Sequence, residues 1–385
     1  MNICHVITRM IVGGAQENTL FTARGHLEHG HQTTLVTGPT TGPEGKLLEK
    51  VRVPELRVVQ IPSLTRELSL LTDYRAYHEL KAHFRAEGYD VVHTHSSKAG
   101  ILARIAATHA GVPLVVHTVH GPPFHAYEKA WRNRIYITAE QLAARYCRKI
   151  YTVADAMTQQ FCNARIGRPE QYQTVYSGMD LQSYLDAKPE CELRKSLGIP
   201  KDSLVVGKIA RLFDLKGYEY LVEAAPAIVK EHPNVRFLIV GDGLLRESLE
   251  QQFTEAGVRE HIVFTGLVPP DHIPRYTALM DVLVHLSLRE GLPRTVVQAL
   301  AAGIPAVGFP LDGTPEAILD GKTGYLCEVH NATAVAGAVN KLLRSPQLRE
   351  ELGSAGREHV RHKWDWHTMV DTLEAGYEKE LNKSR

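Results

Sequence analysis

The stretch from Glu290 to Gln298 holds residue types that could bind a sugar and a phosphate together. Glu290 ends an expected loop, and Pro293 suits the first turn of the following helix, because its missing N–H would have no partner there. The backbone N–H groups of Arg294 and Thr295 would lie unpaired in that turn, where partial positive charge favours a phosphate. Glu290 would accept hydrogen bonds from nearby hydroxyls. Sugar and phosphate together are the chemistry of a nucleotide-sugar donor.

Two cations, Arg211 and Lys216, follow the apolar run Leu204–Ile209, and Lys216 with Gly217 opens an expected helix. A guanidinium and an ammonium at one strand end could hold a diphosphate and stabilise its charge as it departs. Two solvated surface cations are the alternative. The chain contains no Asp-x-Asp, the pair that typically holds a divalent cation against a diphosphate. We therefore expect charge stabilisation without a metal and without a cofactor.

Glycines follow two of the expected strands. Gly13 and Gly14 come after the first strand, and Gly241 and Gly243 come after the run Phe237–Val240. Glycine lets a backbone approach a ligand closely and leaves N–H groups available. An ordinary tight turn is the alternative at both places. Neither pair forms the full Gly-x-Gly-x-x-Gly fingerprint of dinucleotide binding.

Histidines also occur at expected strand ends. His120 ends the run Val115–Val119 and could hydrogen-bond a sugar or orient the reacting groups, although a purely structural role is the alternative. His93 and His95 alternate at the end of another strand and could form a metal pair. No carboxylate or cysteine near them in the sequence completes a metal site, so we expect none.

Short apolar runs alternate with helical stretches along the chain, the pattern of βαβ units and a mainly parallel sheet. A Pro- and Gly-containing connector near 168–200 interrupts the pattern, which then restarts. This favours two doubly wound α/β domains, 1–180 and 181–365, with a terminal helix over 366–385 that packs back on the first. Ligands of such sheets bind beyond the carboxyl ends of the strands, so we expect the site in the cleft between the domains. The expected strands are Asn2–Ile7, Thr33–Thr37, Asp90–His93, Leu114–Thr118, Lys149–Val153, Leu204–Ile209, Val235–Val240, His261–Thr265, Val282–His285 and Ala306–Gly308.

Composition sets broad limits. The chain has 385 residues, is 44% apolar and carries a formal net charge of +1, so no strongly basic surface for nucleic acid is expected. Its 5 cysteines are odd in number and widely spaced, which favours a reducing cytoplasm over a disulfide framework. The apolar amino terminus lacks the charged region of a signal peptide, and no apolar run is long enough to span a bilayer.

A basic segment over 129–149 interleaves cations with aromatic residues. A basic amphipathic helix can lie on an anionic membrane surface, so peripheral contact with the inner face of a membrane is one interpretation. A solvated helix face, with its apolar side in the core, is the alternative. The residues concerned are Lys129, Trp131, Arg132, Arg134, Tyr136, Arg145, Tyr146, Arg148 and Lys149.

Taken together, these motifs resemble those of the retaining glycosyltransferases of the GT-B fold and GT4 type, over nearly the whole chain. The most specific is the run HLSLREGLPRTVVQALAAGIPAVGFPLDGTPEAI, which holds the acid-x7-acid position of that family. The stretches Thr94–Gly100 and Thr118–Phe124 also resemble enzymes that build surface polysaccharides on lipid-linked acceptors. The matching motifs elsewhere are the Gly13 and Gly14 loop, His120 in Thr-Val-His-Gly, the Arg211 and Lys216 clamp, and Gly241 and Gly243 in Val-Gly-Asp-Gly.

The resemblance implies transfer of a sugar from a nucleoside-diphosphate donor, by default a UDP-sugar, to a carbohydrate or lipid-linked hydroxyl with retention at the anomeric carbon. The first domain would bind the acceptor and the second the donor. We expect Arg211, Lys216, Glu290 and His120 to act in catalysis. We expect Gly13, Gly14, Gly241, Gly243, Leu292, Arg294, Thr295 and Gln298 to bind the donor.

Gln298 departs from the family pattern, which usually has a second glutamate that holds the nucleotide ribose. A glutamine amide can still donate and accept hydrogen bonds, but a neutral group should hold the ribose less firmly than a charged one. The sequence leaves rivals open: a nucleotide-sugar epimerase or a phosphorylase of the same fold, a dinucleotide-dependent oxidoreductase, and a non-catalytic nucleotide-sugar-binding relative.

Overall fold

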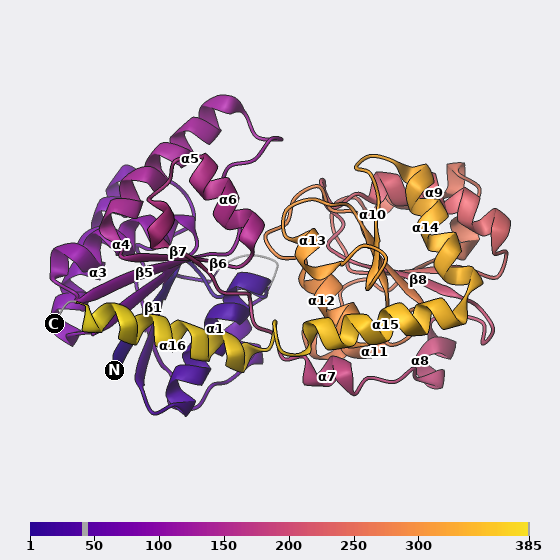
Figure 1. Cartoon of the computed structure of the whole chain (residues 1–385). Helices are drawn as coiled ribbons and strands as arrows, with labels where there is room; N and C mark the ends of the chain where they lie inside the picture. The colour runs from indigo at the N-terminus through magenta and orange to yellow at the C-terminus, as the bar shows by residue number, and fades with distance from the viewer. Residues whose placement is uncertain (41–44, 384–385) are drawn as a thin grey trace. The chain divides into compact units, whose positions relative to one another are not determined.

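The computed structural model describes residues 1–40 and 45–383 and divides the protein into two compact units (Figure 1). The first unit comprises Met1–Met179 with Asp365–Arg385, and the second comprises Asp180–Trp364. The chain passes from the first unit to the second after Met179 and returns after Trp364. Each of these boundaries lies one residue before the boundary expected from the sequence. Each unit is a parallel sheet with alternating helices, which confirms the predicted α/β class.

The first unit contains a parallel sheet of strand order β3-β2-β1-β4-β5-β6-β7. The chain starts in the middle of this sheet and changes direction between β1 and β4. Its central strands are buried on both faces, which is why they read as continuous apolar runs. The strands are β1 Asn2–Ile7, β2 Gln32–Thr37, β3 Arg57–Gln60, β4 Val91–His95, β5 Leu114–Val119, β6 Lys149–Thr152 and β7 Tyr172–Thr174.

Helices cover both faces of this sheet, with α1 and α16 on one face and α3, α4 and α5 on the other (Figure 1). The carboxyl-terminal α16 packs on α1: the Phe21 and Trp366 rings stack with centroids 5.6 Å apart, and the Asn18 amide contacts the Met369 sulfur at 2.9 Å. The last helix of the chain therefore belongs to the core of the first unit. The helices are α1 Gly14–Glu28, α2 Leu47–Lys50, α3 Leu70–Glu87, α4 Ser97–Ala110, α5 Ala130–Ala143, α6 Asp155–Asn163 and α16 Trp366–Asn382.

The second unit contains a parallel sheet of strand order β10-β9-β8-β11-β12-β13. The chain again starts in the middle and changes direction, here between β8 and β11. The strands are β8 Val205–Ile209, β9 Arg236–Val240, β10 Ile262–Phe264, β11 Val282–His285, β12 Ala306–Gly308 and β13 Gly324–Leu326. The helices are α7 Gln182–Leu185, α8 Cys191–Ser196, α9 Tyr218–Glu231, α10 Arg246–Glu255, α11 Ile273–Thr277, α12 Arg294–Ala301, α13 Thr314–Ala317, α14 Ala332–Arg344 and α15 Pro346–Arg361.

The composition of the basic segment 129–149 suggested a single amphipathic helix, but the segment does not form one. It consists of α5, a 3-10 turn over Ala144–Tyr146, and the start of β6. Arg148 and Lys149 lie beyond the helix, where their side chains donate to the backbone oxygens of Glu380 and Glu170. Only the amino-terminal cations of the segment therefore lie on α5 or at its start. Within residues 1–40 and 45–383, every helix is too short or too polar to cross a bilayer.

Candidate active site

The predicted site residues of the second unit come from loops that follow neighbouring strands. β8 and β11 lie side by side at the point where the strand order reverses, the usual ligand position in such sheets. The loop after β8 carries Arg211 and Lys216, and the loop after β11 carries Glu290. A backbone hydrogen bond of 2.9 Å, from Leu288 N–H to the Leu215 oxygen, ties the two loops together.

This pairing brings Lys216 and Glu290 into contact, with Nζ 2.5 Å from Oε1. The two side chains keep 26% and 22% of their surface exposed, so the ion pair remains open to solvent and to a ligand. Burial alone would raise the pKa of Glu290, but the Lys216 ammonium and His285 outweigh it and hold that pKa below its ordinary value. Glu290 is therefore a carboxylate at neutral pH and can only accept hydrogen bonds.

A third loop fixes the backbone of Glu290. The Glu290 N–H donates to Asp312 Oδ2 at 2.7 Å, and Asp312 follows β12 with a positive φ of 49°. The Ser287 side chain also hydrogen-bonds the Glu290 carboxylate. The position of this acid is therefore set by loops from β11 and β12 as well as by its contact with Lys216.

Two buried basic residues near this pair have no role in the sequence analysis. Lys208 lies on β8 with its Nζ 4.8 Å from the centre of the Tyr218 ring, and burial, with the nearby Lys216 charge, lowers its pKa to about 7. His285 ends β11, and burial lowers its pKa to about 4. Its Nε2 has no hydrogen-bond partner among the residues that the structure describes. A charged residue inside an apolar run, as in Val-Val-Gly-Lys-Ile, was the sequence signal for Lys208.

The start of α12 differs from the expectation in two ways. The helix begins at Arg294, so Pro293 is the N-cap residue and not the first helical residue. The Arg294 N–H donates to the Leu292 oxygen at 2.9 Å. It is therefore not available to bind a phosphate, contrary to the prediction. The Thr295 N–H has no acceptor in the described part of the chain, and the Thr295 hydroxyl lies 3.5 Å from His285 Nδ1. Thr295 therefore keeps the anion-binding potential of this helix end.

Gly241 and Gly243 bring the loop after β9 against the loop after β8. Their φ angles are 137° and 157°, and a Cβ at either position would lie 2.2 Å from the Ala210 oxygen or 2.5 Å from the Leu212 oxygen. The Leu212 N–H in turn donates to the Asp242 oxygen at 3.0 Å. These glycines therefore position the loop that carries Arg211, a role beyond the donor contact expected from the sequence and the ordinary turn that was its alternative.

The remaining predicted residues of this unit lie near the same loops. Arg211 is exposed, with its guanidinium carbon 5.2 Å from the centre of the Phe213 ring. Leu292 is buried just before α12, and Gln298 is half-buried within that helix. Gln298 lies one helical turn beyond Arg294, so both residues lie on the same side of α12.

In the first unit, the predicted residues also follow neighbouring strands. Gly13 is the N-cap of α1 and Gly14 its first residue, in the connection after β1. His120 directly follows β5, and its Nε2 lies 3.0 Å from Nδ1 of His95 at the end of β4. The Thr8 and Ser96 hydroxyls, 2.9 Å apart, join the segments that follow β1 and β4. All of these groups lie at the carboxyl edge of the first sheet.

His95 belongs to a buried cluster that the sequence analysis recognised only in part. Ring nitrogens of His5, His93 and His95 lie within 4.8 Å of one another, so a histidine on β1 completes what looked like a pair. Hydrogen bonds already engage both nitrogens of each ring, since His93 contacts Tyr377 and Thr118 while His5 and His95 contact other histidines. The arrangement fits a hydrogen-bonded cluster better than an ion site.

Comparisons with known proteins match this architecture. Residues 13–178 match the family described as glycosyl transferase 4-like domain, and residues 190–359 match glycosyl transferases group 1. An Escherichia coli UDP-Gal:alpha-D-GlcNAc-diphosphoundecaprenol alpha-1,3-galactosyltransferase is 31% identical over 293 residues, which cover 75% of this chain and 74% of that protein. The chain belongs to the GT4-type glycosyltransferases.

A further relative and a solved structure of a similar protein support the same family and fold. A GDP-mannose-dependent alpha-(1-6)-phosphatidylinositol monomannoside mannosyltransferase from Mycolicibacterium smegmatis is 30% identical over 280 residues, covering 68% of this chain and 69% of that one. The crystal structure of Anabaena HepE in complex with UDP superposes with a TM-score of 0.84 at 23% identity, covering 98% of this chain and 100% of that one. This likeness shows the GT-B fold that the motifs predicted.

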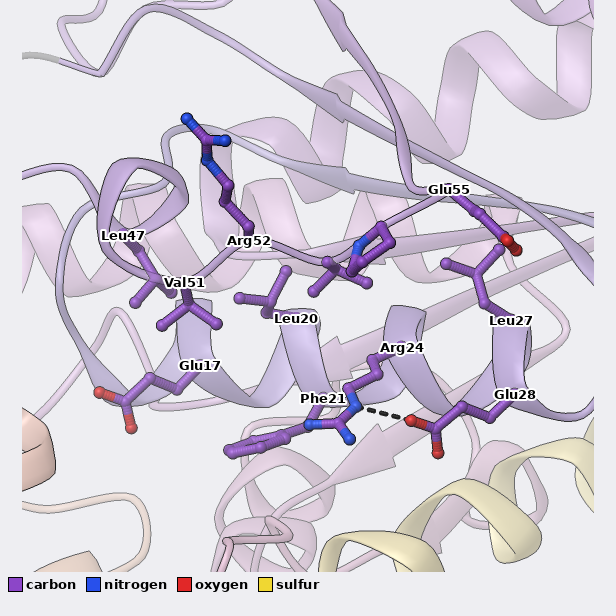
Figure 2. A pocket seen from close by; sticks show the side chains of 12 residues that line it. Glu17, Leu20, Phe21, Arg24, Leu27, Glu28, Leu47, Val51, Arg52 and Glu55 are labelled. Carbon is purple, nitrogen blue, oxygen red and sulfur yellow. Dashed lines mark hydrogen bonds and ion pairs between the residues drawn. The ribbon is translucent and has the colours of Figure 1, made fainter.

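The glycosyltransferase also has a pocket of about 480 Å³ in its first unit, away from the predicted residues (Figure 2). It lies over α1 and the segment that runs from α2 towards β3, and none of the predicted site residues lines it. Leu20, Leu47 and Val51 form part of its apolar wall, and an exposed Arg24–Glu28 ion pair of 2.7 Å lies at its rim. Its lining also includes charged side chains, among them Arg52 and Glu55, but it shares no residue with the loops that carry Arg211, Lys216 and Glu290.

Proposed function

We propose that this glycosyltransferase moves a hexose from a nucleoside diphosphate to an acceptor hydroxyl, with retention at the anomeric carbon and without a metal. The contact between Lys216 and Glu290 carries the proposal, because it places a cation for a phosphate and an acceptor for sugar hydroxyls 2.5 Å apart. A donor joins its sugar to its diphosphate at a single bond, so both groups are needed at one point.

The departing diphosphate would be held by groups from two loops of the second unit. The Lys216 ammonium would turn from Glu290 to the phosphate, while the Arg211 guanidinium and the Thr295 N–H would contact its other oxygens. Removing one preorganised contact to a developing anion typically costs about 3 kcal/mol of barrier, roughly a hundredfold in rate. These cations, with no Asp-x-Asp in the sequence, support metal-independent transfer.

Glu290, released from Lys216, would accept hydrogen bonds from sugar hydroxyls as positive charge develops on the ring. His120, from the first unit, would contact the sugar. The family resemblance implies substitution on one face of the sugar, in which the leaving phosphate oxygen helps to deprotonate the acceptor. In this assignment the first unit binds the acceptor, and the donor is bound by residues of both units: Gly13, Gly14, Gly241, Gly243, Leu292, Arg294, Thr295 and Gln298.

Mutation of Lys216 tests the proposal. For Lys216→Ala, kcat should fall about a hundredfold. Lys230→Ala, which changes an exposed lysine in the last turn of the helix that follows Lys216, should leave kcat unchanged. NMR of the product should show the anomeric configuration of the donor, and activity should persist in a chelator. An unchanged kcat in Lys216→Ala would contradict the phosphate contact.

Two relatives support a proposal for the donor and the acceptor. One of those relatives uses UDP-galactose with a diphosphoundecaprenol-linked acceptor, and another depends on GDP-mannose. We propose a UDP-hexose as donor and a lipid-linked carbohydrate as acceptor, in the synthesis of a surface polysaccharide or glycolipid. Transfer from a panel of UDP-, GDP- and ADP-sugars identifies the donor. Conversion of the donor without acceptor would instead indicate an epimerase, and binding without conversion a non-catalytic relative.

A lipid-linked acceptor gives the exposed face of α5 a role. Trp131, Ile135 and Leu142 are 59%, 54% and 48% exposed and recur at helical spacing, and Lys129 and Arg132 accompany them. The opposite face carries the buried Glu140. We propose that this exposed stripe lies on the anionic inner surface of a cytoplasmic membrane, where apolar side chains and nearby cations both favour binding.

Co-sedimentation with vesicles that contain anionic phospholipid tests the membrane contact. The protein should bind at low salt, and Trp131→Ser with Ile135→Ser should release it. Leu267→Ser, at an even more exposed apolar residue of the second unit, should bind as the wild type does. No binding of the wild type at low salt would end the membrane proposal without affecting the catalytic one.

A further inference from the structure

Four histidine rings of the first unit form one continuous row, which we call the histidine relay: His26, His5, His95 and His120. His26 Nδ1 lies 3.0 Å from His5 Nε2, His5 Nδ1 lies 3.0 Å from His95 Nε2, and His95 Nδ1 lies 3.0 Å from His120 Nε2. The first three rings are fully buried. The relay therefore connects α1, β1 and β4 to the residue that follows β5, which the proposed function assigns to the sugar.

The protons of such a row cannot be placed independently. Burial lowers the pKa values of His5, His26 and His95 far below 6.5, so each of these rings carries a single proton at neutral pH. Every contact between two ring nitrogens needs one proton, and each ring supplies one. The position of the His26 proton therefore determines all the others. Only two arrangements exist, one with that proton on Nε2 and one with it on Nδ1.

Glu374 on α16 distinguishes the two arrangements. Its Oε1 lies 3.8 Å from His26 Nε2, and neither buried atom has a hydrogen-bond partner within the described residues. His29 Nδ1 lies 2.8 Å from the other carboxylate oxygen, and His31 Nε2 lies 3.4 Å from Oε1. A carboxylate repels a nitrogen lone pair and attracts an N–H, so it favours the proton on His26 Nε2.

With the proton on His26 Nε2, the proton positions of the other rings in the relay follow. His5 and His95 then carry their protons on Nε2, which leaves His95 Nδ1 to accept from His120 Nε2. We propose that Glu374 acts through the histidine relay as a positioning residue that fixes the His120 proton on Nε2 and leaves Nδ1 as an acceptor. The inference rests on the proposed function for the role of His120 in transfer. A donor-sugar hydroxyl that meets Nδ1 must then donate its proton to it.

Other titratable groups surround the relay without entering it. The His93 ring lies against His95 in a tilted arrangement, with ring centroids 4.2 Å apart, but its own nitrogens contact Tyr377 and Thr118. The Met1 amino group lies 3.1 Å from His31 Nδ1, which directs the His31 N–H towards Glu374. Among the described residues, the charged and titratable groups around the relay include the Met1 amino group, His29, His31, His93, Arg104, His117, Tyr151, Glu374 and Tyr377.

NMR of the full chain labelled with ¹⁵N at histidine, recorded at pH 8 without donor, tests this directly. Long-range proton–nitrogen spectra distinguish protonated from unprotonated ring nitrogens, with His120→Ala to assign the signal. In the wild type, His120 should carry its proton on Nε2. In Glu374→Gln, whose amide can also donate to His26, the preference should fall about tenfold, the usual strength of a hydrogen bond to a charged group.

Asp371→Asn is the matched control. Asp371 lies one turn earlier on α16, is largely exposed and lies 4.0 Å from His29, which is outside the relay. Its removal should leave the His120 proton on Nε2. Three outcomes would overturn the inference: a proton on His120 Nδ1 in the wild type, an unchanged tautomer in Glu374→Gln, or a stoichiometric transition metal in the purified protein, since an ion would replace the shared protons.

Kinetics separate this inference from the proposed function. Glu374→Gln should lower kcat about fivefold with little change in KM, and it should have no further effect in the His120→Ala background. If His120→Ala leaves transfer unchanged while the tautomer still depends on Glu374, then the assignment of His120 fails and the relay stands. If His120→Ala slows transfer but the His120 tautomer is unchanged in Glu374→Gln, then the relay inference fails and the proposed function stands.

Discussion

The Asp312 carboxylate accepts the backbone N–H of Glu290, with Oδ2 2.7 Å from the nitrogen. Because this bond fixes the backbone and not the side chain, the Glu290 carboxylate can exchange Lys216 for a sugar without losing its position. Asp312→Ala should therefore lower kcat about tenfold, which corresponds to one lost hydrogen bond to a charged acceptor. Asp312→Asn keeps an oxygen acceptor and tolerates the positive φ, so it should retain most of the activity. Equal kcat values in the two variants would contradict this role.

Gln298→Glu should strengthen nucleotide binding. A carboxylate accepts hydrogen bonds from ribose hydroxyls more strongly than a neutral amide does, by about 1 kcal/mol or roughly fivefold in Kd. Calorimetric titration with the nucleoside diphosphate measures the change, and kcat should move little because Glu290 and Lys216 are untouched. Weaker binding in Gln298→Glu would show that the amide of the natural residue donates a hydrogen bond that a carboxylate cannot supply.

A buried ion pair joins α4 to α5. Arg104 Nη2 lies 2.6 Å from Glu140 Oε2, and the two side chains are 0% and 3% exposed. Glu140→Leu leaves the guanidinium buried without its partner, so the free energy of unfolding should fall by about 3–5 kcal/mol in urea titrations. The double variant Arg104→Met with Glu140→Leu should recover most of that loss.

The exposed pair Arg24 and Glu28 is the control for this prediction, because its side chains are 50% and 44% exposed at a similar distance. Glu28→Leu should cost less than about 1 kcal/mol, since solvent screens the charges. If Glu28→Leu lowered the free energy of unfolding as much as Glu140→Leu does, burial would not be the cause of the loss at the Arg104–Glu140 pair.

Lys208 predicts a dependence of stability on pH. Its pKa is about 7 in the folded protein against 10.5 for the free group, so between these values the unfolded chain binds more protons than the folded one. Its contribution to the free energy of unfolding therefore rises with pH, by about 1.4 kcal/mol per unit between pH 7 and 10. Lys208→Met lacks this term and should be more stable than the wild type at pH 7, with a difference that shrinks as pH rises.

Thermal unfolding of both proteins at a series of pH values measures this difference. The comparison cancels the other titrating groups, which the two proteins share. A difference that stays constant from pH 7 to pH 9 would show that Lys208 keeps its ordinary pKa in the folded state.

Most of the central strands could be predicted because both of their faces are buried, which leaves continuous apolar runs such as Asn2–Ile7 and Val282–His285. The edge strands β3, β7 and β13 were missed, although the edge strand β10 was predicted. β3 is largely exposed, and β7 and β13 have only 3 residues each. These strands exist because a neighbour offers backbone partners, and a local pattern does not contain that information.

The same limit applies to the sites. The loops after the strands were identified, since polar residues and glycines punctuate the apolar runs, but the contact of Lys216 with Glu290 depends on β8 lying beside β11. The histidine relay escaped notice for the same reason. His5 lies on β1, which pairs with β4, the strand that ends in His95. Only the pairing of two strands far apart in sequence reveals that their rings share one interior.

Helix α16 has a consequence for how the protein is made. The first unit is built from both ends of the chain, because Trp366 and Met369 complete a core whose strands come from the first 174 residues. During synthesis, that half must wait for the whole second unit to be translated before its apolar surface on α1 is covered. We therefore expect this apolar face of α1 to stay uncovered in the nascent chain while residues 180–364 are translated.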